Sequence, residues 1–316
     1  MKPVKEAQLD VLSRNVIQAF DDLSGLHPGF RPAHAKGILL SGVFTPSPGG
    51  KSLTRAPHLQ RSSTPATVRF SDATGIPAIP DNDLNASPRG IAIRFHLAEH
   101  VHTDIIAHST DGFPTRTAQE FLEFLRAAHA SGPGAAKPTA LESFLAAHPA
   151  ALRFVQTPKP IPSSYAKESY FAVNAYKFTN HSGVARFGRF RVRPDGGSEY
   201  LSPEIAAAKP GDFLIDEIKH RIATGPTRLR ITVQLAEAGD VVDDSTVQWP
   251  ESRTQIDFGM LQLTAVALNN EAEQNRIIFD PIPRVEGIDS SGDPLLEPRA
   301  AIYLASGRRR RAARAK

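Results

Sequence analysis

Cysteine is absent from the 316 residues of the chain. Its absence excludes disulfide bonds, thiolate metal sites and a cysteine nucleophile. Long apolar runs are also missing, since none approaches the ~20 residues that a membrane helix needs. The first six residues, MKPVKE, lack the apolar core of a secretory signal. We therefore expect a cytoplasmic protein without a membrane partner, with a processed precursor as the alternative.

Positive charge is in excess only near the C-terminus. The formal net charge is +4, from 37 Lys and Arg residues against 33 Asp and Glu residues. Without the basic residues of the last nine positions, 31 basic residues stand against 33 acidic ones, a net charge of −2. Such a body has no basic face for nucleic acid, so we expect no nucleic-acid partner. The terminal basic residues are Arg308, Arg309, Arg310, Arg311, Arg314 and Lys316.

Two further absences narrow the class of protein. No G-x-S-x-G motif is present, so acyl-transfer chemistry has no visible nucleophile. No internal repeat and no long linker divides the chain. We expect a single domain over residues 1–316, with an N-terminal helix in 1–25 and a basic C-terminal tail in 307–316. The composition, 41% hydrophobic and 22% charged, is typical of a soluble globular protein.

The spacing of apolar residues predicts both helices and strands. Residues 7–24 have the pattern of an amphipathic helix, and the sequence TAQE at 117–120 is a capping box that opens another. The Pro-rich segment 45–52 ends like a P-loop but lacks its first glycine, so we interpret it as a loop. Six or more antiparallel strands with inserted helices favour an α+β protein built on a sheet or barrel. The predicted strands are 38–44, 67–71, 90–96, 171–178, 184–192, 228–235 and 259–268.

His34 is the first candidate for chemistry. It lies in the segment RPAHAKG, three residues after Arg31 and just before the strand predicted over 38–44. Two interpretations are open for it: a histidine that is hydrogen-bonded at a strand entrance, or a base held over a buried site.

The last predicted helix carries a second candidate pair, Arg299 and Tyr303. Pro298 suits the first position of a helix and Gly307 suits the position just after its end. Arg299 and Tyr303 are four residues apart and therefore share one helix face. A guanidinium beside a phenol favours the phenolate, and tyrosinate is a recognised ligand of haem iron. Core packing of an aromatic ring beside an arginine is the alternative.

A third candidate is the histidine-rich run His96-Leu97-Ala98-Glu99-His100-Val101-His102. Histidines at this spacing can ligate zinc or non-haem iron if two or three converge on an open position. In an extended run His100 and His102 share a face, whereas in a turn they point outward. A metal site therefore stays open as an alternative.

Five segments, in order over residues ~25–311, resemble the haem catalase family. RPAHAKG resembles the family's R-x-x-H-A-K-G motif, and VRFS at 68–71 is identical to its V-R-F-S segment. RGIAIRF at 89–95 is similar to R-G-F-A-x-K-F. Glu273-Gln274 followed by Phe279 resembles E-Q-x-x-F-x-P, and Arg299 with Tyr303 resembles R-x-x-x-Y. The resemblance implies a minimal catalase core, an α+β fold in which an antiparallel β-barrel of about eight strands has inserted and flanking helices.

The resemblance also implies haem b as the cofactor, with iron bound by Tyr303. Arg299 would hold that tyrosine as phenolate. On the opposite, distal side, His34 would be the base that moves a peroxide proton, and Ser71 would orient it by a hydrogen bond. These are catalytic and metal-binding roles that the family's motifs carry over to this chain.

Further residues match positions that hold the haem in the family. Arg31, Arg69 and Arg310 match arginines that pair with haem propionates, an interaction suited to guanidinium groups. Phe113 and Phe121 match aromatic residues that pack in the distal pocket. In this interpretation Arg310, within the basic tail, has a role in cofactor binding.

The chain departs from full-length catalases in two respects. It stops shortly after Tyr303, so we expect no counterpart of the C-terminal helical region of those enzymes. In addition, His108 falls on the position of a distal asparagine that helps to position hydrogen peroxide. A shortened chain with the segment Ala107-His108-Ser109 resembles the catalase-related peroxidases, or mini-catalases.

The resemblance therefore implies a peroxidase that protects against oxidative stress. We expect it to reduce organic hydroperoxides, and hydrogen peroxide with weak catalatic activity, with an organic electron donor as its second substrate. A homo-oligomer is left open. The alternatives are a hydroperoxide isomerase or lyase of the allene oxide synthase type, and a haem- or metal-binding protein without turnover.

Overall fold

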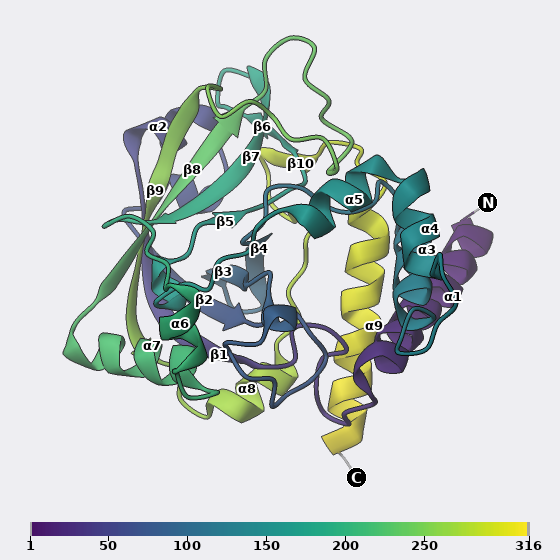
Figure 1. Cartoon of the computed structure of the whole chain (residues 1–316). Helices are drawn as coiled ribbons and strands as arrows, with labels where there is room; N and C mark the ends of the chain where they lie inside the picture. Colours follow the sequence, from purple (N-terminus) through teal and green to yellow (C-terminus); the bar gives the residue numbers. More distant parts are fainter. Residues whose placement is uncertain (1, 315–316) are drawn as a thin grey trace.

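The computed structural model describes residues 2–314 of the chain (Figure 1). Within that range, antiparallel strands pair in the order β7-β5-β4-β3-β2-β1-β9-β8, and β8 pairs again with β7 to close the sheet into an eight-stranded barrel. Two short strands, β6 and β10, extend the sheet beyond β7. The prediction of an α+β fold built on an antiparallel barrel is confirmed. The strands are β1 (Gly37–Pro46), β2 (Thr64–Ser71), β3 (Gly90–Ala98), β4 (Val101–His108), β5 (Tyr170–Phe171), β6 (Tyr176–Thr179), β7 (Ala185–Pro194), β8 (Thr227–Leu235), β9 (Gln255–Val266) and β10 (Ile288–Ser290).

Strand alternation builds the interior of the barrel. In β1, residues 42, 44 and 46 are buried while 41, 43 and 45 are exposed, as expected for a strand with one face on a core. The inward side chains include several aromatic rings. Phe44 packs edge-to-face on Phe95 at 4.9 Å between ring centroids, and Phe190 packs on Phe258 at 5.1 Å. Such rings bury large apolar areas, which makes this cluster the main source of hydrophobic stabilisation.

Helices cover the outside of the barrel (Figure 1). The first and last long helices, α1 and α9, lie side by side with α3 next to them, and Val16, Leu122 and Leu125 form a second, smaller core there. No helix within residues 2–314 is both long and apolar enough to cross a membrane. The helices are α1 (Lys2–Ser24), α2 (Pro48–Leu53), α3 (Ala118–His129), α4 (Ala140–Ala147), α5 (Pro149–Gln156), α6 (Pro203–Ala207), α7 (Phe213–Thr224), α8 (Asn270–Arg276) and α9 (Leu296–Arg314), with 3-10 turns η1 (Pro57–Leu59), η2 (Leu84–Ala86) and η3 (Tyr165–Lys167).

The predicted capping box opens α3 as expected. Thr117 Oγ1 accepts a hydrogen bond from the Glu120 backbone N–H at 3.2 Å, and the Glu120 carboxylate accepts one from the Thr117 N–H at 3.3 Å. Two donors that a helix start leaves unpaired are thereby satisfied.

Two local predictions are wrong. Segment 45–52 is not a loop, because β1 continues to Pro46 and α2 begins at Pro48, where Ser47 caps the helix by accepting from the Gly50 N–H. The strand predicted over 171–178 is broken between β5 and β6. Asn174, in the gap, donates to Asp293 at 2.7 Å, so its side chain serves a distant contact rather than the sheet.

The predicted end of the last helix is also wrong. The helix begins at Leu296, two residues before Pro298, and runs through Gly307 to Arg314, so the part of the basic tail up to residue 314 is helical. Gly307 is needed for close packing and not for a turn, since a Cβ there would come within 2.2 Å of Ile278. Lys316, the last residue of the predicted tail, lies outside the described residues.

Candidate active site

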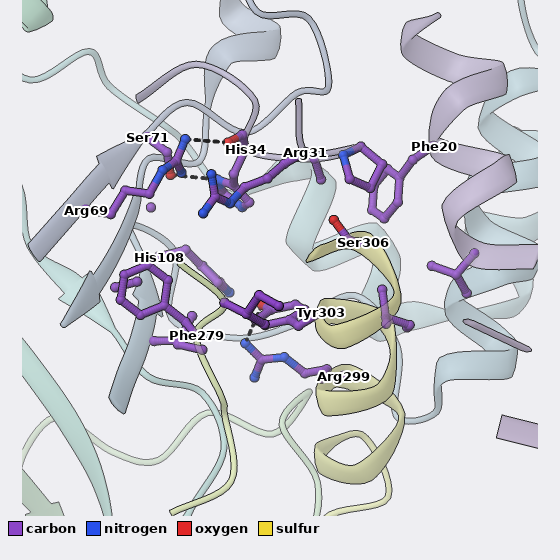
Figure 2. A pocket seen from close by; sticks show the side chains of 18 of the residues that line it. Phe20, Arg31, His34, Arg69, Ser71, His108, Phe279, Arg299, Tyr303 and Ser306 are labelled. Atoms are coloured by element: carbon purple, nitrogen blue, oxygen red, sulfur yellow. Dashed lines mark hydrogen bonds between the residues drawn. The ribbon is translucent and has the colours of Figure 1, made fainter. Parts of the chain in front are cut away.

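One cavity, with a volume of about 230 Å³, brings together all ten site residues that the sequence predicted (Figure 2). It lies between the barrel wall and the helices α1, α3 and α9, and most of its lining is apolar. The predicted residues in its lining are Arg31, His34, Arg69, Ser71, His108, Phe113, Phe121, Arg299, Tyr303 and Arg310.

His34 is held in an unusual backbone conformation at the edge of the barrel. Its φ of +57° is in the left-handed region, which is uncommon for a residue other than glycine. The backbone N–H donates to the Ala73 carbonyl at 2.9 Å, and the carbonyl accepts from Arg69 Nη2 at 2.9 Å. The surrounding chain thus imposes this conformation, a pattern that is common at functional sites.

The imidazole of His34 is oriented from one side. Its Nδ1 is hydrogen-bonded to Ser71 Oγ at 3.1 Å, and within the described residues Nε2 has no protein partner. The ring lines the cavity. Burial, and then the charge of Arg69, lowers the pKa of His34 to about 4. The ring is therefore neutral near pH 7 and can accept a proton from a ligand in the cavity.

Gly90 makes the approach of these two side chains possible. A Cβ at this position would lie 2.7 Å from Ser71 Oγ and 2.9 Å from His34 Nδ1, so only glycine fits. The sequence analysis did not identify Gly90 as a site residue. Its place at the start of a predicted strand, after the Arg of RGIAIRF, was the available signal.

His108 lies in the same cavity at the end of β4. Its backbone is paired with Gly90 of β3 and Phe171 of β5. Nδ1 accepts a hydrogen bond from the Thr110 N–H at 3.3 Å. Burial, followed by the charges of Arg299 and His34, lowers the pKa of His108 to about 3. A second neutral imidazole therefore lines this part of the cavity.

Tyr303 projects from α9 into the cavity and is paired with Arg299 one turn earlier (Figure 2). Arg299 Nη2 donates to the Tyr303 hydroxyl at 3.2 Å, and Arg299 Nη1 donates to Asn174 Oδ1. Burial alone lowers the pKa of Arg299, but the nearby oxygens of Tyr303 and Tyr176 raise it more, and the net pKa lies above its usual value. A permanent cation therefore faces the phenol oxygen.

Asn174 and Asp293 form the support of that arginine, and the sequence analysis assigned a role to neither. Asn174 Nδ2 donates to Asp293 Oδ2 at 2.7 Å, and Asp293 Oδ1 accepts from the Leu295 N–H at 2.9 Å, at the start of α9. The polar Asn174 inside an otherwise apolar strand pattern was the one available signal.

Three arginines converge where α9 meets the loop before β1. Arg31 Nη2 and Arg310 Nη2 both donate to the Ile277 carbonyl, at 3.2 and 2.9 Å, and Arg69 Nε donates to Gln274 at 2.9 Å. In the described part of the chain none of the three forms an ion pair with a carboxylate, and the buried Arg310 Nε has no partner at all.

Burial and mutual repulsion lower the pKa values of these arginines. Burial, and then the neighbouring Arg310, lowers the pKa of Arg69 to about 9, and burial, then Arg311, lowers that of Arg310 to about 10. Burial and Arg69 together hold the pKa of Arg31 well below its usual range. Buried guanidinium groups without acidic partners are expensive, so this end of the cavity fits a ligand that carries carboxylates.

Aromatic rings complete the lining. Phe113 and Phe121 are in contact at 5.0 Å between ring centroids, and Phe121 also packs against Phe20 of α1 at 5.9 Å. On the barrel side Phe279 lies under the guanidinium of Arg94, 5.2 Å from the ring centroid. The cavity can therefore enclose a flat apolar group between a phenol oxygen and an imidazole.

The histidine-rich run does not form a metal site. His96 and His102 face each other across β3 and β4, His96 is bonded to Thr67, and His100 is in the exposed turn between the strands. No group of three or more His, Asp or Glu side chains within residues 2–314 is arranged to hold a metal ion.

The chain is similar to known proteins of one family. The family model described as Catalase matches residues 27–316. A protein named Catalase-related peroxidase, from Mycolicibacterium paratuberculosis, is 34% identical over 293 residues, which is 92% of each chain. Another of that name, from Synechococcus elongatus, is 30% identical over 95% of this chain and 89% of its own.

Solved structures of catalases share the fold. A fungal catalase superposes with a TM-score of 0.78 at 23% identity, over 89% of this chain and 59% of its own. A bacterial catalase superposes with a TM-score of 0.77 at 22% identity, over 89% of this chain and 57% of its own. The chain thus spans less than two thirds of these larger proteins.

Proposed function

The chain belongs to the catalase family and is a peroxide-acting oxidoreductase, and we propose that it is a haem b peroxidase that reduces organic hydroperoxides with electrons from an organic donor. One observation carries the proposal: Tyr303 with its arginine and His34 with its serine face the same, mostly apolar cavity. That pairing is what a peroxidase needs, a ligand for iron on one side and a base on the other.

The residues of the cavity fit a haem. Tyr303 would ligate the iron, and Arg31, Arg69 and Arg310 would bind the propionates, which supply the carboxylates that these three buried cations lack. Phe113, Phe121 and the rest of the apolar lining would enclose the ring. When bound, haem supplies an iron centre that accepts an oxygen atom from the peroxide and two electrons from a donor.

The chain itself moves the proton. His34 is neutral near pH 7, so its Nε2 can take the proton from the inner oxygen of a bound hydroperoxide. The same nitrogen then returns the proton to the departing outer oxygen, which leaves as an alcohol, or as water from hydrogen peroxide. Overall, one hydroperoxide, two electrons and two protons give one alcohol and one water. Ser71 fixes Nδ1 and so keeps Nε2 directed at the ligand.

His108 supports a peroxidase over an efficient catalase. It brings an imidazole with a pKa of about 3 to the cavity, at the position where the resemblance to full-length catalases predicts a primary amide. A neutral imidazole offers one N–H in a fixed direction, whereas an amide offers two and an oxygen acceptor. We therefore propose that a second hydrogen peroxide is poorly oriented and that catalatic turnover is weak.

The test is a spectrum and two product assays on purified holoprotein. We expect a Soret band, oxidation of an aromatic donor with cumene hydroperoxide, and little oxygen from hydrogen peroxide. His34→Ala should slow the reaction with peroxide by about 10²- to 10⁴-fold, and Ser71→Ala by less, because it removes only the orienting bond. Oxygen evolution at the rate of a full-length catalase would contradict the role given to His108. Isomerised or cleaved product without a donor would instead indicate a hydroperoxide isomerase or lyase.

A further inference from the structure

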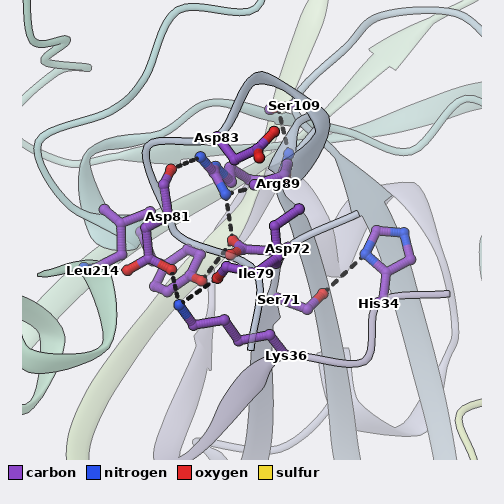
Figure 3. A network of polar contacts seen from close by, with 12 residues as sticks. His34, Lys36, Ser71, Asp72, Ile79, Asp81, Asp83, Arg89, Ser109 and Leu214 are labelled. Atoms are coloured by element: carbon purple, nitrogen blue, oxygen red, sulfur yellow. Dashed lines mark hydrogen bonds and ion pairs between the residues drawn. The ribbon is translucent and has the colours of Figure 1, made fainter. Parts of the chain in front are cut away.

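A cluster of buried charged residues lies next to the segment that carries His34 and the end of β2 that carries Ser71 (Figure 3). Lys36 Nζ is 2.6 Å from Asp81 Oδ1 and 2.6 Å from Asp212 Oδ1. It also donates to the carbonyls of Ile79 and Gly211, both at 2.8 Å. Lys36 and Asp81 are buried, whereas Asp212 is exposed to solvent. Lys36 therefore bridges the buried carboxyl group of Asp81 and the exposed carboxylate of Asp212.

Asp72 is the second acidic residue of the cluster. Its Oδ1 accepts hydrogen bonds from the Tyr165 hydroxyl, at 2.7 Å, and from Arg89 Nη1. Arg89 is fully buried and also donates to the carbonyls of Ala86 and Asp81. Asp72 Oδ2 has no hydrogen-bond partner among the described residues. A buried carboxylate oxygen without a donor is costly.

Three members of the cluster lie within two residues, along the sequence, of a residue on the His34 side of the cavity. Lys36 follows His34 by two residues, and Asp72 directly follows Ser71. Arg89 directly precedes Gly90, and its backbone exchanges two hydrogen bonds with Ser109, at 2.9 Å each. Ser109 directly follows His108. The cluster therefore joins the four backbone segments that present His34, Ser71, Gly90 and His108.

The ribbon formed by residues 34–36 and 72–74 needs such an anchor. It is held by backbone hydrogen bonds from His34 to Ala73 and from Ala35 to Thr74, both at 2.9 Å, and from Asp72 to Lys36 at 3.2 Å. His34 has a positive φ, a conformation that persists only where the surroundings enforce it. Lys36 and Asp72, one on each side of the ribbon, direct their side chains into the cluster.

Asp81 is placed to change its charge near neutral pH. Burial, and then the neighbouring carboxylate of Asp72, raises the pKa of Asp81 to about 7. Lys36 and the N–H of Leu214 at the start of α7, 2.7 Å from Oδ2, act in the opposite direction. The other charged or titratable groups facing the cluster are Asp212, Arg89, Tyr165 and, beyond Arg89, Glu168.

We propose that the cluster of Lys36, Asp72, Asp81 and Arg89 positions His34, and that protonation of Asp81 controls how tightly the ribbon is held. This inference rests on the proposed function only in giving His34 its role as the base. With a proton on Asp81, the Asp72 carboxylate has no like charge beside it and keeps its hydrogen bonds to Arg89 and Tyr165. Without it, two adjacent carboxylates repel each other while Lys36 is shared with Asp212. The ribbon is then looser and His34 less well aligned.

The experiment follows the ribbon across pH, from about 5.5 to about 8.5. Amide hydrogen exchange gives protection factors for peptides that contain 34–36 and 72–74, with or without haem. In holoprotein, the rate of cyanide binding, read from the Soret band, reports the alignment of His34. Both should show an inflection near pH 7 in the wild-type protein, with protection about tenfold lower on the alkaline side. Asp81→Asn, a permanently uncharged isostere, should abolish both inflections.

Glu168→Gln is the matched control. Glu168 is also buried, burial raises its pKa to about 7, and it accepts from Tyr200 at 2.7 Å without a hydrogen bond to any member of the cluster. This variant should keep the wild-type inflection. If it abolishes the inflection, or if Asp81→Asn retains it, the proposal is wrong. A wild-type profile without an inflection would overturn it as well.

Asp212→Asn is a second test of the proposal, which holds even if the Asp81→Asn protein does not fold. Asp212 is exposed, so the variant should be stable, and it leaves Lys36 to Asp81 alone. Ionisation of Asp81 becomes easier, and the exchange inflection should move down by roughly half a pH unit. An unmoved inflection would contradict the proposal. If the proposed function is wrong, the protein shows no Soret band, whereas the pH dependence of hydrogen exchange stays as described.

Discussion

The guanidinium of Arg299 lies one helical turn before Tyr303 and donates to its hydroxyl at 3.2 Å. Its other terminal nitrogen is bound to Asn174, which Asp293 holds in turn. A charge on the phenol oxygen is thus balanced by a cation whose own position is fixed from the opposite side. The two residues act as one unit, so the loss of either residue should impair the role of the other.

Replacement of Arg299 by lysine should therefore weaken haem binding, although the charge is kept. A lysine is a single point donor and cannot bind Asn174 and Tyr303 together, as the planar guanidinium does. We expect on the order of tenfold weaker retention of haem, from the loss of one charge-assisted hydrogen bond. The ratio of Soret to protein absorbance measures this. Tyr303→Phe should lose the ferric-tyrosinate spectrum altogether, and if it does not, the iron ligand is another residue.

Substitution of Gly90 by alanine should damage the site and leave the fold. The new methyl group would lie within 3 Å of both Ser71 Oγ and His34 Nδ1, so their hydrogen bond must break. We expect the rate of reaction with peroxide to fall at least about tenfold, with the wild-type Soret band retained. Gly132→Ala is the control, since its Cβ would meet nothing nearer than 3.9 Å. Equal rates for the two variants would show that the Ser71–His34 bond is unimportant.

Removal of Arg310 should affect haem-free and haem-bound protein in opposite directions. Without haem, Arg310→Gln removes a buried cation that has no acidic partner, so the unfolding temperature should rise. With haem, the same change removes a partner of a propionate, so haem should dissociate about tenfold faster. Arg308→Gln, which removes an exposed charge from the same helix, should change neither quantity. A fall in the stability of the haem-free protein would contradict this account of Arg310.

His58 should make the fold sensitive to acid. The ring is 1% exposed, is stacked on Phe95 at 4.8 Å, and has a buried Nδ1 without a partner. Burial, and then the charge of Arg61, lowers its pKa to about 3. The unfolded chain binds this proton near pH 6.5 and the folded chain does not, so stability falls as the pH decreases from about 6.5 toward 3.

His58→Phe should remove that part of the acid sensitivity, because phenylalanine keeps the ring stacking without a titrating group. Urea unfolding at about pH 5 and about pH 7.5 measures it. We expect a smaller difference in unfolding free energy between the two pH values for the variant than for the wild-type protein, by roughly 1–2 kcal/mol. An identical difference in both proteins would show that other groups carry the acid dependence.

The sequence predicted the antiparallel barrel correctly, and it identified residues that lie together in one cavity. His34, Ser71 and Tyr303 lie in short motifs whose spacing is independent of the rest of the chain, and the structure places them on one cavity. Their functional roles stay predictions, as do the cytoplasmic location, the single domain and the oligomeric state.

What the sequence did not reveal depends on contacts between distant segments. Gly307 lies inside the helix and packs against Ile278, and Asn174, in the break between β5 and β6, binds Asp293. The pairing of Lys36 with Asp81 likewise follows from how the barrel closes. No local pattern of spacing or propensity contains this information.

The position of helix α9 after all the barrel strands also has a consequence for synthesis. Helix α9 follows every barrel strand in the sequence, so during translation the barrel emerges before the wall that carries Tyr303 and Arg310. Haem should therefore be captured only once α9 docks, late in the life of the nascent chain. Ribosome-bound chains that end before Leu296 should retain no haem, and those that expose residues 296–314 should retain it.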